Sequence, residues 1–111
     1  MKAAVYSETG GPSVFRYEDL PDPDCRPGGV IVEIKAIGIQ GGDTLNRLGG
    51  MIASRPHVVG YQASGIIKQV GDRVTDRHVG DRVVATMAFG SHAELASVPA
   101  GSTYLLPASL S

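Results

Sequence analysis

Residues 58–84 read VVGYQASGIIKQVGDRVTDRHVGDRVV, and this stretch decides the fold. Glycines at positions 60, 65, 71 and 80 separate short runs rich in aliphatic residues, and Val-Gly-Asp-Arg-Val occurs at both 70–74 and 79–83. Because glycine adopts positive φ at little cost and aspartate can bond its own backbone, each Gly-Asp pair predicts a turn. The stretch therefore predicts tightly folded β-structure, with one strand over residues 64–70.

The rest of the chain carries the same punctuation, since 15 glycines and 7 prolines are spread along its 111 residues. Frequent breakers favour short strands over long helices. Residues 30–40 give the clearest strand, because an apolar face alternates with a mixed one. Further strands are expected over residues 2–6, 14–20, 82–89 and 92–98, with Gly90-Ser91 as the hairpin turn between the last two.

One short helix is expected over Asp43–Leu48, with Asp43 as its N-cap and Gly49-Gly50 as its stop. The last residues resemble the approach to another helix, capped by Ser109 or Ser111. A cap without its helix predicts that the chain is part of a longer protein. From the residues alone, the fold class is mainly β with short helices.

Composition narrows the classes of function. The sequence has 42% apolar and 19% charged residues, as an ordinary soluble domain does. Its net charge of −1 gives no basic field for nucleic acid or for an anionic membrane, so neither partner is expected. Cys25 is the only cysteine, which excludes an internal disulfide and a cysteine-rich zinc site. No signal peptide or membrane-spanning stretch is recognisable, and a cytoplasmic protein is expected.

Several motifs follow one another in a definite order along the chain. They are Pro27–Val32 with Ala36–Ile39 and Asp43, then Gly60–Gly65, Val70-Gly71, Val79–Val83, Gly90–Glu94 and Leu106–Ser111. Together they resemble the N-terminal GroES-like catalytic domain of the medium-chain dehydrogenase/reductase superfamily. The resemblance implies an irregular GroES-like β-barrel for residues 1–111, covering one side of a cleft. It also implies that NADPH is bound mainly by a Rossmann domain absent from this chain, because no Gly-x-Gly-x-x-Gly motif occurs in the sequence.

Within the superfamily, the resemblance is to the zinc-independent, quinone oxidoreductase-like branch. Zinc alcohol dehydrogenases have a cysteine at the position of Gln40 and a His-Glu pair at Tyr61-Gln62, and the residues present here are poor zinc ligands. No metal is therefore expected. Zinc-free members commonly carry Asn-x-x-Asp where this chain has Gln40-Gly41-Gly42-Asp43. By that resemblance, the Gln40 carboxamide is expected to contact the nicotinamide of the cofactor. From the residues alone, the alternative is a solvated polar residue at the end of a strand.

The same resemblance places Asp43, Met51, Tyr61 and Gln62 along the substrate cleft. Met51 and Gln62 stand where such enzymes tend to have a tyrosine and a glutamate. From the residues alone, an alternative stays open for two of these residues. Asp43 can serve as a helix cap, and Tyr61 can pack beside Gly60.

The three histidines follow no metal-ligand spacing. His78 lies in a charged turn and is expected in solvent, whereas His92 is expected to pack. His57 and Arg55 belong to a loop beside the cleft. There they could contact substrate and a cofactor phosphate respectively, with a solvated charge as the alternative for Arg55.

The function implied by the resemblance is NADPH-dependent hydride transfer to a quinone or an α,β-unsaturated carbonyl, both small molecules, in a protein that could be a homo-oligomer. The cofactor carries the chemistry while the protein orients it. One alternative is a zinc-type alcohol dehydrogenase relative that has lost its metal ligands. The other is a GroES-like binding or assembly module without catalysis.

Overall fold

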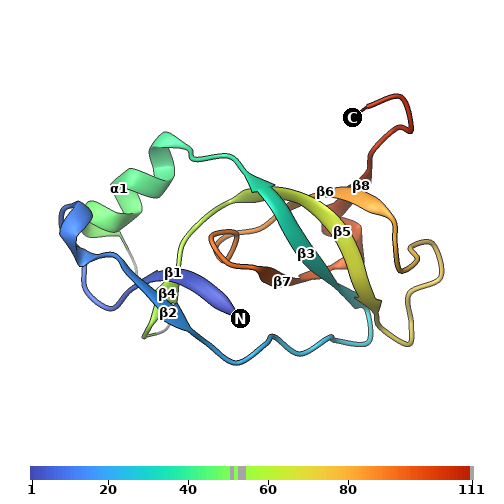
Figure 1. Ribbon diagram of the computed structural model, residues 1–111, viewed down its shortest axis with the longest axis horizontal. Coiled ribbons are helices and arrows are strands. Elements are labelled where there is room, and N and C mark those ends of the chain that lie inside the picture. The colour runs from blue at the N-terminus through green and yellow to red at the C-terminus, as the bar shows by residue number, and fades with distance from the viewer. Residues whose placement is uncertain (51, 53–54, 111) are drawn as a thin grey trace.

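A computed structural model describes residues 1–50, 52 and 55–110 of the chain. Its elements in chain order are β1 (Lys2–Tyr6), the 3-10 turn η1 (Pro12–Val14), β2 (Arg16–Asp19), β3 (Gly29–Ile37), α1 (Gly41–Gly49), β4 (His57–Val58), β5 (Gln62–Val70), β6 (Arg82–Thr86), β7 (Leu95–Pro99), the 3-10 turn η2 (Ala100–Ser102) and β8 (Thr103–Leu105). The mainly β class with short helices is confirmed (Figure 1).

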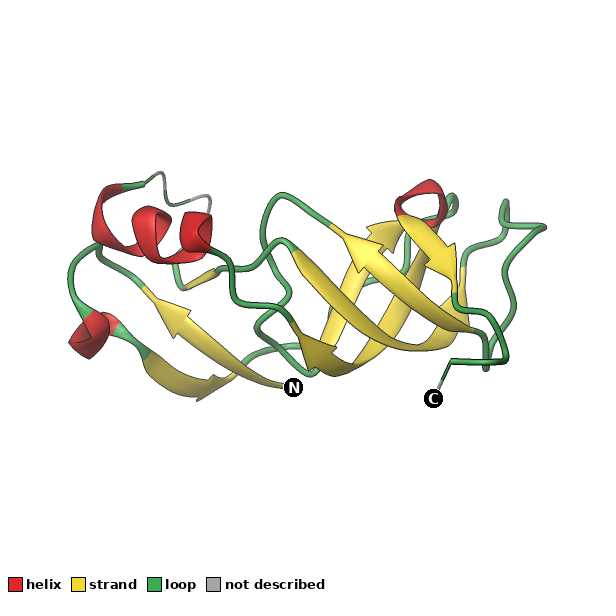
Figure 2. Cartoon of the chain, turned by 90° about the horizontal axis from the view of Figure 1, so that it is seen from above, coloured by secondary structure: helices red, strands yellow, loops and turns green. Residues whose placement is uncertain are grey.

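The strands form two antiparallel sheets that lie side by side along the molecule (Figure 2). The larger sheet has the order β7-β3-β5-β6-β8, and the smaller has the order β2-β1-β4. Helix α1 lies over the small sheet. In the part of the chain that the structure describes, the two sheets are open and do not form a closed barrel. The irregular barrel expected from the resemblance takes this open form.

Strands β3 and β5 are the centre of the large sheet. The alternation seen in residues 30–40 turns Val30 and Val32 into a core shared with neighbouring strands. The pairing of β3 with β5 shifts register twice, between Ile31 and Val32 and between Ile34 and Ala36. Gly65 lies at this irregular pairing, where a Cβ would collide with the carbonyl oxygen of Glu33. A side chain is excluded here by the close approach of two backbones.

The hairpin predicted at Gly90-Ser91 is wrong. Strand β6 pairs with β5 and β8, whereas β7 pairs with β3 on the far side of the sheet. The connecting residues 90–94, which we call the strap, instead cross to the small sheet. Ala4 N–H donates to the His92 carbonyl at 2.9 Å, and Ile34 N–H of β3 donates to the Glu94 carbonyl at 2.8 Å. The strap thus joins the two sheets through its backbone.

The helix begins earlier than predicted, and Asp43 is not its N-cap. Gln40 takes that position, and Asp43 lies in the first turn with its carboxylate accepting the Gln40 N–H at 2.9 Å. An aspartate three residues inside a helix can still satisfy the start of that helix, by reaching back to the cap residue. The predicted stop is confirmed, since α1 ends at Gly49 and the Gly50 N–H donates to the Asn46 carbonyl at 2.7 Å.

Candidate functional site

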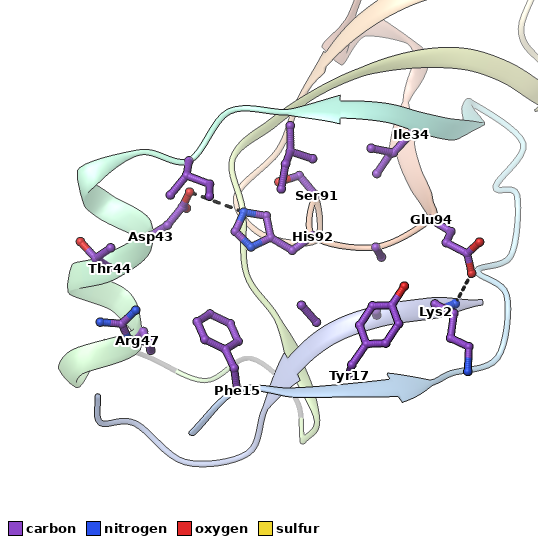
Figure 3. Close-up of a pocket in the computed structure, with 15 residues that line it drawn as sticks. Lys2, Phe15, Tyr17, Ile34, Asp43, Thr44, Arg47, Ser91, His92 and Glu94 are labelled. Atoms are coloured by element: carbon purple, nitrogen blue, oxygen red, sulfur yellow. Dashed lines mark hydrogen bonds and ion pairs between the residues drawn. The ribbon is translucent and has the colours of Figure 1, made fainter. Parts of the chain in front are cut away.

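A hollow of about 530 Å³ lies between α1, the small sheet, β3 and the strap (Figure 3). Apolar side chains such as Phe15, Ile34 and Ile37 form much of its wall. Asp43 and His92 lie together at one side of it, pointing toward each other from α1 and from the strap. The hollow therefore combines an apolar wall with one concentrated polar region.

Four buried polar atoms gather in this half of the molecule. They are the Tyr6 hydroxyl, Asp43 Oδ1, Ser91 Oγ and His92 Nε2, and none has a hydrogen-bond partner among the described residues. Asp43 is only 3% exposed. Its other oxygen, Oδ2, accepts the Gln40 N–H and lies 3.8 Å from His92 Nε2. Buried polar atoms without partners are rare in proteins, so this region is set apart from an ordinary core.

The electrostatics of the region follow from its burial. Burial lowers the pKa of His92, and the nearby Asp43 carboxylate acts in the opposite direction without reversing it. Burial also raises the pKa of Tyr6, and the charge of Asp43 adds to that rise. Desolvation disfavours the charged form of each group, so both side chains are held neutral near pH 7.

Tyr61 packs against the first turn of α1. Its hydroxyl oxygen accepts a hydrogen bond of 2.6 Å from Asn46 Nδ2, and its ring covers Gly42, where a Cβ would lie 2.8 Å from Tyr61 Cε2. The absence of a side chain at Gly42 therefore admits the ring. Tyr61 therefore contacts the helix, and its hydroxyl proton is left for another acceptor.

The other predicted site residues lie close to this turn. Gln40 is exposed at the N-cap of α1, and the Gln62 side chain covers Gly38, two positions before it. The structure thus brings Gln40, Asp43, Tyr61 and Gln62 around the start of α1. Met51, also predicted for the cleft, lies outside the described residues.

The remaining candidates are placed elsewhere. His57 is 4% exposed and lies between the rings of Tyr6 and Phe89, at centroid distances of 5.2 and 5.5 Å, and burial lowers its pKa. Arg55 donates from Nε to the Ser7 carbonyl at 3.0 Å. The His78 side chain is 78% exposed in its charged turn, as expected. His57 therefore has the environment of a core aromatic residue.

Two structural observations concern metal binding and membrane spanning. Across residues 1–50, 52 and 55–110, no cluster of three or more histidine, cysteine, aspartate or glutamate side chains could hold a metal ion. In the same part of the chain, no helix has the length and apolar character needed to cross a bilayer.

With this geometry in view, comparison with known proteins decides the family. The model of the alcohol dehydrogenase GroES-like domain matches residues 26–108. The chain belongs to this family. The resemblance to the GroES-like domain of the medium-chain dehydrogenase/reductase superfamily, in its quinone oxidoreductase-like branch, is thereby confirmed.

Individual relatives agree with that assignment. A probable quinone oxidoreductase of Schizosaccharomyces pombe is 36% identical over 94 residues, covering 84% of this chain and 29% of that protein. A 2-haloacrylate reductase of a Burkholderia species is 33% identical, covering 97% of this chain and 34% of the reductase. The crystal structure of Escherichia coli quinone oxidoreductase complexed with NADPH has a TM-score of 0.94 and 33% identity, covering 100% of this chain and 35% of that one. The chain spans about a third of the length of these relatives.

Sequence reasoning missed the contact between Asp43 and His92. The two residues are far apart in the chain and neither lies in a motif with the other, so no local pattern announces the contact. Its only local signal is the positive φ of Gly60, where a Cβ would collide with Ser91 Oγ and would lie 2.7 Å from His92 Cδ2. A glycine at this point shows that the strap passes close by.

Proposed function

We propose that this chain is the N-terminal catalytic domain of a longer, zinc-independent, NADPH-dependent oxidoreductase that reduces quinones or α,β-unsaturated carbonyl compounds. The observation that carries the proposal is the group of residues at the start of α1. There Gln40 is the exposed N-cap, the Tyr61 ring lies against Gly42, and the Gln62 side chain lies over Gly38. These three residues stand where metal-dependent relatives carry zinc ligands. The relatives named as quinone oxidoreductase and 2-haloacrylate reductase support the same reaction class.

Gln40 fits one end of the proposed cofactor. Its carboxamide offers one acceptor and two donor hydrogens, which complement the amide group of a nicotinamide. When bound, NADPH supplies the hydride, and Gln40 orients the ring that carries it. Asp43 keeps the backbone of Gln40 in place through the 2.9 Å hydrogen bond. Most of the dinucleotide would be held by a Rossmann domain that these residues do not include, because no glycine-rich pyrophosphate loop occurs in this sequence.

Tyr61 and Gln62 are the residues we assign to the substrate. Asn46 donates to the Tyr61 oxygen, which leaves the hydroxyl proton available for the carbonyl oxygen of a quinone or enone. A hydrogen bond to that oxygen stabilises negative charge as hydride arrives at the substrate carbon. Gln62, lying over Gly38, would contact the substrate on the Gln40 side. Met51 is proposed as an apolar contact on the sequence resemblance alone.

The decisive experiment is Gln40→Ala in the full-length oxidoreductase that carries this chain. Loss of one hydrogen bond of about 1 kcal/mol raises the KM for NADPH by about five-fold. Gln69→Ala is the matched control, since Gln69 is an exposed glutamine on β5, away from α1. Unchanged NADPH kinetics in Gln40→Ala would contradict the cofactor assignment. Stoichiometric zinc in the purified enzyme would contradict the zinc-independent assignment and favour the alcohol dehydrogenase alternative.

A further inference from the structure

Asp43 connects the proposed cofactor residue to a buried histidine. One carboxylate oxygen, Oδ2, accepts the Gln40 N–H at 2.9 Å. The same oxygen lies 3.8 Å from His92 Nε2 (Figure 3). The side chain of His92 is 10% exposed, and its Nε2 has no hydrogen-bond partner among the described residues. The Asp43 carboxylate therefore lies between the Gln40 backbone and His92 Nε2.

The strap holds His92 firmly in this place. The His92 carbonyl accepts from Ala4 N–H of β1 at 2.9 Å, and the His92 N–H donates to the Val59 carbonyl at 3.1 Å. Gly60 leaves room for the ring, because a Cβ there would lie 2.7 Å from His92 Cδ2. The backbone of His92 is thus held from both sides, and Gly60 leaves space for its ring.

The protonation of the ring follows from its neighbour. Burial lowers the pKa of His92, so the neutral imidazole carries one N–H near pH 7. A carboxylate only accepts hydrogen bonds, and it repels the lone pair of an unprotonated nitrogen. The proton is therefore favoured on Nε2, where the N–H dipole faces Asp43. At 3.8 Å this contact is electrostatic, longer than a hydrogen bond.

We propose that His92 is a positioning residue for Gln40. Its Nε2–H orients the Asp43 carboxylate, Asp43 fixes the Gln40 N–H, and the carboxamide is thereby aimed from a fixed first turn of α1. The link from His92 to the Gln40 backbone consists of contacts within this chain and does not depend on a cofactor. The use of that link in cofactor binding rests on the proposed function.

The link can be tested by amide hydrogen exchange, measured with NMR on the full-length oxidoreductase that carries this chain. His92→Phe keeps an aromatic ring but removes the donor, and we expect the Gln40 amide to exchange about five-fold faster, as for one weakened hydrogen bond. His92→Gln returns an N–H near the position of Nε2 and should restore slow exchange. His78→Gln is the control, since His78 lies in an exposed turn. Equal Gln40 exchange in the Phe and Gln variants would overturn the proposal.

A titration of the unaltered chain keeps the proposal testable if His92→Phe fails to fold. The Gln40 amide shift should move with the midpoint of the His92 imidazole. His57 is the other histidine whose pKa is lowered by burial, and its ring lies 5.2 Å from that of Tyr6. Lys2, Arg47 and Glu94 are the charged groups that line the same hollow as the pair. A Gln40 amide that follows the His57 midpoint, or that does not titrate, would contradict the link.

In the full-length oxidoreductase, His92→Phe should raise the KM for NADPH more than it changes kcat, and His92→Gln should reverse the rise. A result in which Gln40→Ala leaves the kinetics unchanged while the exchange data follow His92 would refute the proposed function and leave the link intact. If the exchange of the Gln40 amide is unchanged in His92→Phe while Gln40→Ala raises the KM for NADPH, the link is refuted and the proposed function stands.

Discussion

The large sheet and the small half of this molecule differ in the polar atoms that they bury. The core of the large sheet consists of aliphatic side chains, namely Val30, Val32, Ile67, Val83, Ala85, Ala96 and Val98. The small half, made of β1, β2, β4, α1 and the strap, buries polar atoms of Tyr6, Asp43, Ser91 and His92 for which the described part of the chain offers no hydrogen-bond partner. Apolar burial stabilises a fold, whereas buried polar groups without partners cost free energy. Ala3 and Val5 of β1 are buried as well, so both regions gain from apolar burial. The cost of buried polar atoms falls on the small half.

The strongest test of this division is Gly65→Ala, at the centre of the large sheet. The new Cβ would collide with the Glu33 carbonyl oxygen and lie 2.9 Å from Val32 Cγ1, so β3 and β5 must separate. We expect a loss of more than about 4 kcal/mol in the free energy of unfolding, or no folding at all. Urea denaturation measures it, with Gly28→Ala as control because nothing lies within 4 Å of a Cβ there. Similar stability in the two variants would show that the β3–β5 pairing adapts.

Truncation of matched aliphatic side chains in the two regions should give the next largest difference. Ile67 is fully buried in the large sheet, so Ile67→Ala should cost about 3 kcal/mol of unfolding free energy. Leu45 is exposed on α1, and Leu45→Ala should change stability by less than about 0.5 kcal/mol. Thermal unfolding of both variants checks the pair. A loss at Leu45 as large as that at Ile67 would mean that α1 carries core packing.

The smallest expected effect is a pH dependence confined to the small half. Burial lowers the pKa of His57 and of His92 below the ordinary value of 6.5. The unfolded chain therefore binds more protons than the folded one as the pH falls below that value, and stability decreases on acidification. Urea midpoints measured between about pH 8 and pH 5 should show this decrease. The double variant His57→Phe with His92→Phe should weaken it, and an unchanged slope would assign it to other groups.

The sequence predicted most strands because their patterns are local. The alternation in residues 30–40 and the glycine turns around residues 64–70 need no distant partner to be recognised. Strands β4 and β8 escaped notice, since two or three residues are too short for a period to show. The hairpin at Gly90-Ser91 failed for another reason. A glycine turn shows where the chain bends, but here the strands on its two sides find different partners in the sheet.

Only the candidate site residues that lie in a recognisable motif could be proposed from the sequence. Gln40, Asp43, Tyr61 and Gln62 came from the resemblance, and the structure gathers them at the start of α1. Only the structure shows that Asp43 lies in the first turn of α1 and that Gln40 is the N-cap. The sequence does not distinguish the two, because both polar residues precede the same short helix. His92 could not be foreseen as its neighbour, since their contact depends on the path of the strap.

The strap also has a consequence for the order in which the chain folds. Lys2 N–H donates to the carboxylate of Glu94, a contact that spans 92 positions of the sequence, and Ala4 bonds the strap nearby. Closing so long a loop costs more entropy than closing the pairing of β3 with β5, whose partners run from Ile37↔Ala63 to Val30↔Val70. We therefore expect amide protection at Ala4 to appear after protection in β3 and β5 during refolding. During synthesis, β1 could pair with β2 early, but its contact with the strap would form only after residues 90–94 had emerged.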